Sequence, residues 1–173
     1  MLEALITSKT RIKLLLKFFL NPETAAHLRG LETELGESTN GIRLELNRLQ
    51  QANMIQATMD GNKKLFQVNQ HHPLYDEIHS IVRKFMGLDV IVDHIAKKLG
   101  NLQAVYLSGD MVKGKDSQII DLIMIGEIDE NYLVQMIHKA EAVIERKIRY
   151  LCCDTQEQII DYHLPVMLLL QKD

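Results

Sequence analysis

The stretch that organises the first half of this chain spans residues 38–68 and reads STNGIRLELNRLQQANMIQATMDGNKKLFQV. Its first part repeats apolar residues at the spacing of one helical face, Ile42, Leu46 and Leu49. Its second part places Asp60-Gly61 between two short strand-like runs, which is a strong hairpin signal because both residues can adopt positive φ. We therefore predict an amphipathic helix followed by a β-hairpin.

The opposite side of this predicted helix carries amide and guanidinium groups, on Asn40, Arg43, Asn47 and Gln50. Arg, Asn and Gln can form paired hydrogen bonds with base edges in the major groove. The lysines that follow the hairpin turn are placed to meet phosphates rather than bases. The alternative for the stripe alone is a solvated helix face. With double-stranded DNA as the expected partner, the candidate binding residues are Ser38, Thr39, Asn40, Arg43, Asn47, Lys63 and Lys64.

Upstream of this stretch, Leu28, Leu31 and Leu35 predict another helix, which Gly36 ends. Helix, short turn, polar helix and basic hairpin follow one another in the order of a winged helix-turn-helix. Together with residues 8–15 (SKTRIKLL) and 27–31 (HLRGL), the first 70 residues resemble an ArsR-type winged helix-turn-helix transcriptional regulator. That resemblance implies DNA binding, a role in transcription regulation and a homodimer.

Charge is divided unevenly along the chain. Residues 1–70 hold nine Lys/Arg against seven Asp/Glu, a balance of +2, whereas residues 71–173 hold eleven against sixteen, a balance of -5. The basic excess therefore lies in the half expected to bind DNA, although a surplus of two is mild. A net charge of -3 argues against a protein that is basic throughout.

The remaining composition is that of an ordinary globular protein, with 46% hydrophobic and 25% charged residues. The chain has no apolar run long enough for a membrane span, and its first residues lack a signal-peptide pattern. Two adjacent cysteines, Cys152 and Cys153, cannot form a useful disulfide framework. We expect a cytoplasmic protein that makes no membrane contact.

The N-terminal residues Leu2 to Leu20 predict one amphipathic helix, ending before Asn21-Pro22. It offers more apolar surface than one small helical core requires. Two interpretations remain open, a face against a partner chain or ordinary core packing. A dimer would suit a single recognition helix, which alone reads few base pairs.

His71 and His72 lie in a predicted linker before a helix from Leu74 to about Gly87. Adjacent residues in an extended segment point to opposite sides, and no Cys or carboxylate set stands beside them at metal spacing. The same geometry applies to the two cysteines if they lie on a strand. We expect no metal site and no cofactor.

The second half predicts elements in the order helix, strand, strand, helix, strand, helix, with strands at 104–107, 119–125 and 148–153. This order implies a small mixed sheet with helices against it. The fold class is therefore α+β, divided into a winged helix domain (1–70), a linker helix (71–87) and a second domain (88–173). The final apolar run, residues 164–170, is expected to pack against its own or a partner's domain.

The order of the second half resembles the minimal nucleotidyltransferase domain. That family has a Gly-Ser pair, a Gly five residues after the first, and Asp-x-Asp on the next strand, whose carboxylates hold magnesium. Here the corresponding residues are Gly109, Asp110, Gly114 and Asp121. Asp110 replaces the serine, Ile119 replaces the first metal-binding Asp, and Arg149 falls at the third acidic position.

The resemblance with these departures implies a scaffold without catalytic activity, available for a small-molecule or protein effector or for dimerisation. Asp121 is expected to bond a loop backbone or to pair with Lys113 or Lys115. Three functions remain open from the sequence. The first is a DNA-binding regulator, the second an active nucleotidyltransferase with a rearranged site using Asp110 and Asp121, and the third a protein-interaction adapter without DNA binding.

Overall fold

The computed structural model describes residues 2–161 and 165–172 of the 173-residue chain. It contains helices and two β-sheets, so the predicted α+β class is confirmed. The chain divides into two compact units, Met1–Phe85 and Met86–Asp173. Over the described residues, no helix combines the length and the apolar character that a membrane crossing needs.

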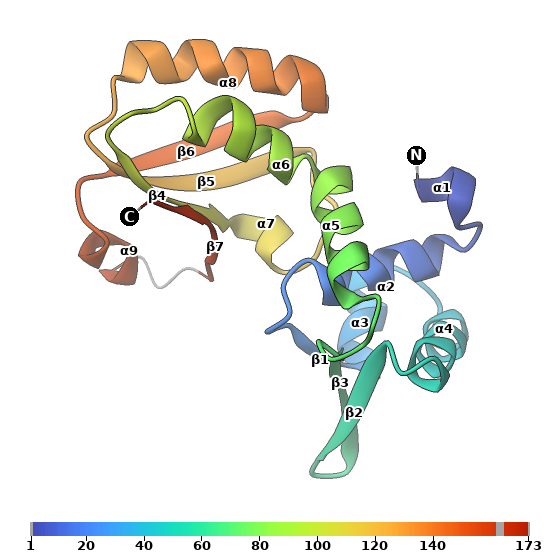
Figure 1. Ribbon diagram of the computed structural model, residues 1–173. Helices are drawn as coiled ribbons and strands as arrows, with labels where there is room; N and C mark the ends of the chain where they lie inside the picture. Colours follow the sequence, from blue (N-terminus) through green and yellow to red (C-terminus); the bar gives the residue numbers. More distant parts are fainter. Residues whose placement is uncertain (1, 162–164, 173) are drawn as a thin grey trace. The chain divides into compact units, whose positions relative to one another are not determined.

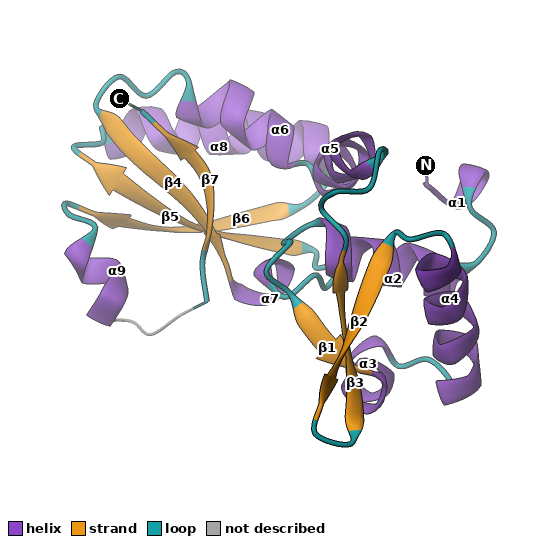
Figure 2. Ribbon diagram, turned by 60° about the horizontal axis from the view of Figure 1, so that its bottom comes forward, coloured by secondary structure: helices purple, strands orange, loops and turns teal. Residues whose placement is uncertain are grey.

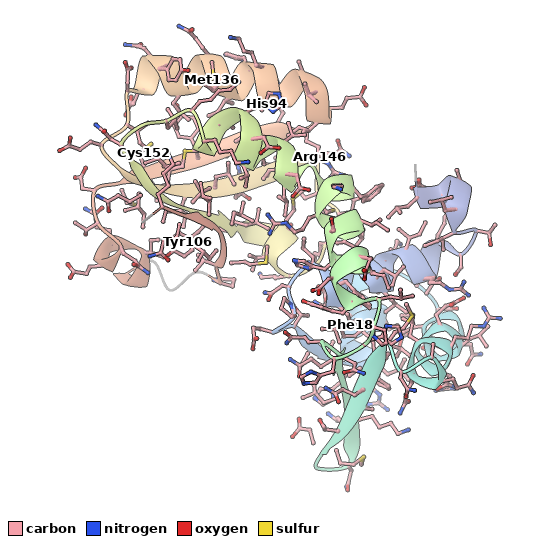
Figure 3. The ribbon with its side chains drawn as sticks, viewed as in Figure 1. Phe18, His94, Tyr106, Met136, Arg146 and Cys152 are labelled. Carbon is pink, nitrogen blue, oxygen red and sulfur yellow. The ribbon has the colours of Figure 1, made fainter. Side chains whose placement is uncertain are left out.

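The first unit begins with two helices, α1 (Leu2–Leu5) and α2 (Lys9–Phe19), where the sequence predicted a single helix from Leu2 to Leu20. The break has a local cause. Ser8 is extended and its Oγ accepts a hydrogen bond from the Arg11 amide, so it caps a new helix instead of continuing the first. In α2, Leu14, Phe18 and Phe19 are fully buried (Figure 3 labels Phe18).

Helices α3 (Leu28–Leu35) and α4 (Thr39–Gln51) lie where the sequence predicted them. Gly36 ends α3 in the left-handed region, with φ of 63°, a conformation that glycine adopts at low cost. Helix α4 packs against both α2 and α3 through its apolar face. Of that face, Ile42, Leu46 and Leu49 are at most 4% exposed.

A three-stranded antiparallel sheet completes this unit, in the order β1-β3-β2. The predicted hairpin is present as β2 (Ile55–Asp60) and β3 (Lys63–Val68), and its turn projects from the unit in Figure 1. The turn differs from the prediction, because Asp60 pairs with Lys63 and leaves Gly61-Asn62 at the tip. Gly61 has φ of 58°, and Asn62 is not among the positive-φ residues, which places glycine at the first central position.

Two further elements join this unit. Strand β1 (Ala25–His27) was not predicted, because three residues carry no periodic signal, and it pairs with β3. Helix α5 (Tyr75–Met86) follows Pro73 as predicted, and its His79 Nδ1 lies 2.5 Å from the Phe19 carbonyl oxygen. Tyr75 stacks between Phe19 and His79, so the start of α5 is fixed to the end of α2.

The second unit is built on a mixed four-stranded sheet in the order β6-β5-β4-β7. The strands are β4 (Leu102–Ser108), β5 (Ile119–Gly126), β6 (Lys147–Cys153) and β7 (Met167–Gln171). Strands β5 and β6 are parallel and are joined by helix α8 (Glu130–Ile144), whereas β4 is antiparallel to both β5 and β7. Strands β4 and β5 are therefore the two central strands of the sheet.

Helices cover this sheet on both sides (Figures 1 and 2). One face carries α8 and α6 (Leu88–Ile91), which continues into a π-helical turn, Val92–Ala96; Met136 of α8 is labelled in Figure 3. The other face carries α9 (Glu157–Asp161), whose Ile159 joins an apolar cluster with Ala104, Tyr106, Ile123, Ile125 and Cys153. Gln156 Nε2 donates to Tyr106 Oη at 2.8 Å.

Three segments of this unit differ from the prediction. The loop after β4 contains one helical turn, α7 (Gly109–Val112). The end of the final apolar run forms an edge strand, β7 (Met167–Gln171), because its backbone pairs with β4. The last helix, which the sequence predicts from Thr155 to about His163, spans Glu157–Asp161 among the described residues, and residues 162–163 lie outside them.

Candidate nucleic-acid interface

The N-terminus of α4 is fixed by a serine cap. Ser38 is extended, with ψ of 142°, and its Oγ accepts a hydrogen bond from the Gly41 amide at 3.1 Å. Gly41 leaves little room there, since an added Cβ would lie 3.0 Å from that Oγ. The first turn of the helix thus has a defined start, and this start sets which residues of α4 lie on its polar side.

Most residues on the polar side of α4 are exposed, as the sequence predicted. Asn40, Arg43 and Asn47 are exposed, whereas Thr39 and Gln50 are half-buried. Arg43 Nη1 lies 3.4 Å from Asn40 Oδ1, a long contact near the limit for a hydrogen bond. These three side chains are therefore available to an external partner.

Glu45 is the residue of α4 that the sequence analysis missed. It is 4% exposed, and its carboxylate accepts from Ser8 Oγ (3.0 Å), Arg11 Nε (2.8 Å) and Arg48 Nη1 (2.9 Å). Burial opposes its ionisation, but the hydrogen bonds from Arg11 and Ser8 and the charges of both arginines outweigh burial and lower the pKa of Glu45. The sequence signal for the burial of Glu45 was its position three residues after Ile42, on the apolar side of the helix.

The turn between α3 and α4 is also bonded to α2. Lys13 Nζ donates to the Leu35 carbonyl at 2.8 Å and to Glu37 Oε1 at 2.7 Å, and Thr10 Oγ1 donates to Glu37 Oε2 at 3.1 Å. The hydrogen bond from Lys13 is the main reason that the pKa of Glu37 is lowered. Polar contacts from α2 thus fix both the turn and the helix that carries the candidate DNA-binding residues.

A groove of about 890 Å³ opens beside α4, bounded by α3 and the β2–β3 hairpin. Four of the predicted residues, Arg43, Asn47, Lys63 and Lys64, line it together with Arg29 and His27. Lys17, also in the lining, is buried and pairs with Glu34 at 2.7 Å. Among the residues that the structure describes, no carboxylate forms an ion pair with Arg29, Arg43, Lys63 or Lys64. The groove therefore presents a cationic surface.

His27 joins the two strands of the hairpin at the groove. Its Nδ1 lies 2.9 Å from the Lys64 carbonyl oxygen, and its Nε2 lies 3.1 Å from Asp60 Oδ2. Together with the pairing of β1 and β3, these contacts fix the turn end of the hairpin relative to the start of α3. The predicted DNA-binding residues therefore form two groups. Ser38, Thr39 and Asn40 lie at the start of α4 and do not line the groove, whereas the other four predicted residues do.

The second candidate site lies in the other unit, where Gly109 and Asp121 line a pocket of about 330 Å³. Ser108, Asp121 and Arg149 are register partners across β4, β5 and β6. Arg149 donates to both carboxylate oxygens of Asp121, from Nε at 2.6 Å and from Nη2 at 3.0 Å. The structure therefore pairs Asp121 with Arg149, a partner that the sequence analysis did not propose, and Lys115 lies 3.8 Å from Asp110 Oδ1.

Gly109 is packed against this ion pair. Its φ is 71°, and an added Cβ would overlap Oδ2 of Asp121. Gly114 also has positive φ, 75°, but it does not line the pocket. The two glycines whose spacing resembles that of the nucleotidyltransferase family therefore lie at two backbone turns, and the turn at Gly109 accommodates the carboxylate of Asp121.

Metal ligands do not gather anywhere in the described part of the chain. No group of three or more His, Cys, Asp or Glu residues there is placed to hold an ion. Cys152 is half-buried and Cys153 is buried, and burial is the main cause that raises the pKa of each thiol.

Comparison with solved structures gives a weak likeness, and comparison of sequences gives none. No family model matches the chain, and no curated protein matches it. Among solved structures, the chain is similar to a tri-AMPylated Shewanella oneidensis HEPN toxin in complex with MNT antitoxin, with a TM-score of 0.39 and 12% identity. The match covers 50% of this chain and 71% of that one, and a likeness of this size supports no argument about fold or function.

Proposed function

We propose that this protein is a DNA-binding transcriptional regulator that reads the major groove with α4 and contacts phosphates with the β2–β3 hairpin. In this proposal the first unit is a winged helix-turn-helix of the ArsR type. The double-stranded DNA is its partner, and two copies of the chain bind two half-sites about one helical turn apart. The site of action is the cytoplasm.

The observation that carries the proposal is the groove between α3, α4 and the hairpin. It brings the guanidinium of Arg43 and the amide of Asn47 to the same concavity as Lys63 and Lys64, although the two pairs come from separate elements. A base-reading helix and a phosphate-binding loop must act on one duplex at once, so this grouping is what the function requires. The polar network of Glu45 and Glu37 supplies the rigidity that base readout needs.

For the second unit we propose a nucleotidyltransferase-like scaffold without catalysis, serving an effector or dimerisation. Catalysis of that type needs two or more carboxylates around magnesium. Here the carboxylate of Asp121 is neutralised by Arg149, which stands across from it on the neighbouring strand. Because the guanidinium holds both oxygens of this carboxylate, Asp121 is not free to bind a metal ion.

A selection of bound duplexes from random DNA, at stated salt, tests the regulator proposal. The expected result is an enriched sequence with two half-sites. On that sequence, Arg43→Ala should lose about 1–3 kcal/mol of binding free energy if Arg43 reads a base. The matched control is Lys139→Ala, which removes one exposed positive charge from the second unit and should leave specific binding unchanged.

Two results would count against the proposal. One is a wild-type chain that enriches no duplex and shows no salt-sensitive affinity for DNA. The other is an enriched duplex whose binding is the same for the wild type and Arg43→Ala. Sedimentation of the protein with the selected duplex then reports whether two copies bind one site.

A further inference from the structure

The outermost row of α4 contains one apolar side chain among polar ones. Asn40, Leu44, Asn47 and Gln51 follow the i, i+4, i+7, i+11 spacing of a single helical face, opposite the buried residues Ile42, Leu46 and Leu49. All four are exposed, and Leu44 is 52% exposed. Leu44 therefore lies on the part of the helix that would enter a groove first.

The residues around Leu44 indicate what kind of surface this side of α4 can bind. Asn40 and Arg48, one helical turn before and after it, carry an amide and a guanidinium, and Asn47 lies beside it. Arg48 Nη1 is bonded to the buried Glu45, which holds this side of the helix in place. A partner for this row must offer hydrogen-bonding groups on either side of one apolar group.

The floor of the DNA major groove has that pattern. Each base pair shows donors and acceptors there, and the apolar group on it is the C5-methyl of thymine. We propose that Leu44 is a specificity-determining residue that contacts a thymine C5-methyl in each half-site. This inference rests on the proposed function, and it adds one base-specific contact, made by packing instead of hydrogen bonding.

The contact between Leu44 and thymine can be tested by removing the C5-methyl group alone. In the selected duplex, each thymine in turn is replaced by deoxyuridine, which keeps every Watson–Crick hydrogen bond and removes the C5-methyl. We expect wild-type binding to weaken at one position per half-site, by roughly fourfold, the effect of burying one methyl-sized apolar group. Leu44→Ala should weaken binding to the thymine duplex similarly and should bind the thymine and uridine duplexes equally.

Two controls separate this effect from a general loss of structure. Leu44→Ala replaces an exposed leucine with a residue of higher helix propensity, so the variant should fold. Leu74→Ala removes a leucine of equal exposure, 52%, that lies outside α4, and it should keep the full sensitivity to uridine.

The outcomes are distinguishable from those that test the proposed function. A selection that enriches no duplex overturns both proposals. An enriched duplex that binds equally with thymine or uridine at every position overturns the Leu44 contact alone. That contact is likewise overturned if Leu44→Ala retains the wild-type sensitivity to uridine.

Discussion

Arg149 on β6 and Asp121 on β5 are register partners in a parallel strand pair, and the guanidinium holds both oxygens of the carboxylate, at 2.6 and 3.0 Å. Bidentate contacts of this kind combine charge with fixed geometry. Hydrogen bonding to Asp121 raises the pKa of Arg149 further above its already high ordinary value, so the positive charge stays in place at every accessible pH.

This ion pair leads to a prediction about catalysis. The purified chain, mixed with nucleoside triphosphates, magnesium and a panel of protein and nucleic-acid acceptors, should transfer no labelled nucleotide. Asp121→Ala should be indistinguishable from the wild type in that assay. Transfer that requires magnesium and disappears in Asp121→Ala would instead establish an active nucleotidyltransferase.

The packing of Gly109 predicts a local loss of stability. Gly109→Ala should lower the free energy of unfolding of the second unit by at least about 1 kcal/mol, because alanine is strained at φ of 71° and its Cβ overlaps Asp121. Hydrogen exchange of amides in β4 and β5 along a urea series measures the change. Gly100→Ala is the control, since nothing lies within 4 Å of its added Cβ and no positive φ constrains it. Equal stability of the two variants would contradict this account of Gly109.

The hairpin lysines predict a change in salt dependence. If Lys63 and Lys64 contact phosphates, replacing either with alanine should weaken binding to all duplexes about equally and reduce the slope of log K against log salt by about 1. The double variant should reduce the slope by about 2. Titrations at several salt concentrations provide the measurement, with Lys139→Ala as the charge-matched control. A slope that stays at the wild-type value would exclude phosphate contacts by these lysines.

Glu45 predicts a loss of stability that depends on pH. Glu45→Gln should lower the free energy of unfolding of the first unit by about 1–3 kcal/mol at neutral pH, because Arg11 and Arg48 lose a charged acceptor. The matched control, Glu32→Gln, alters an exposed glutamate of α3 and should change stability little.

The sign of the pH effect follows from the lowered pKa of Glu45 in the folded protein. Its contribution is fully present above the unfolded value, about 4.3, and is lost as the pH falls through the lower folded value. Urea unfolding from about pH 7 to about pH 3 should therefore show the wild type approaching Glu45→Gln in acid. A difference between the two proteins that is constant with pH would show that the charge of Glu45 contributes nothing.

Several features of this fold follow from short stretches of sequence. Ile42, Leu46 and Leu49 define the buried face of α4 by their spacing alone, and Gly36 and Ser38 mark the end of one helix and the start of the next. The hairpin follows from Gly61 between two strand-forming runs. Each signal lies within about one helical turn or one tight turn, so no distant contact is needed to interpret it.

The pairing of strands and the partners in ion pairs could be identified only from the tertiary structure. The sequence shows residues 164–170 only as an apolar run, and it is the pairing with β4 that makes Met167–Gln171 a strand. The partners of Asp121 and Glu45 stand 28 and 34 residues away, in Arg149 and Arg11. The sequence determined which segments bury their apolar faces, because periodicity is local. The register of the strands and the docking of α2 on α4 decided which charges meet, because those pairings depend on how distant segments pack.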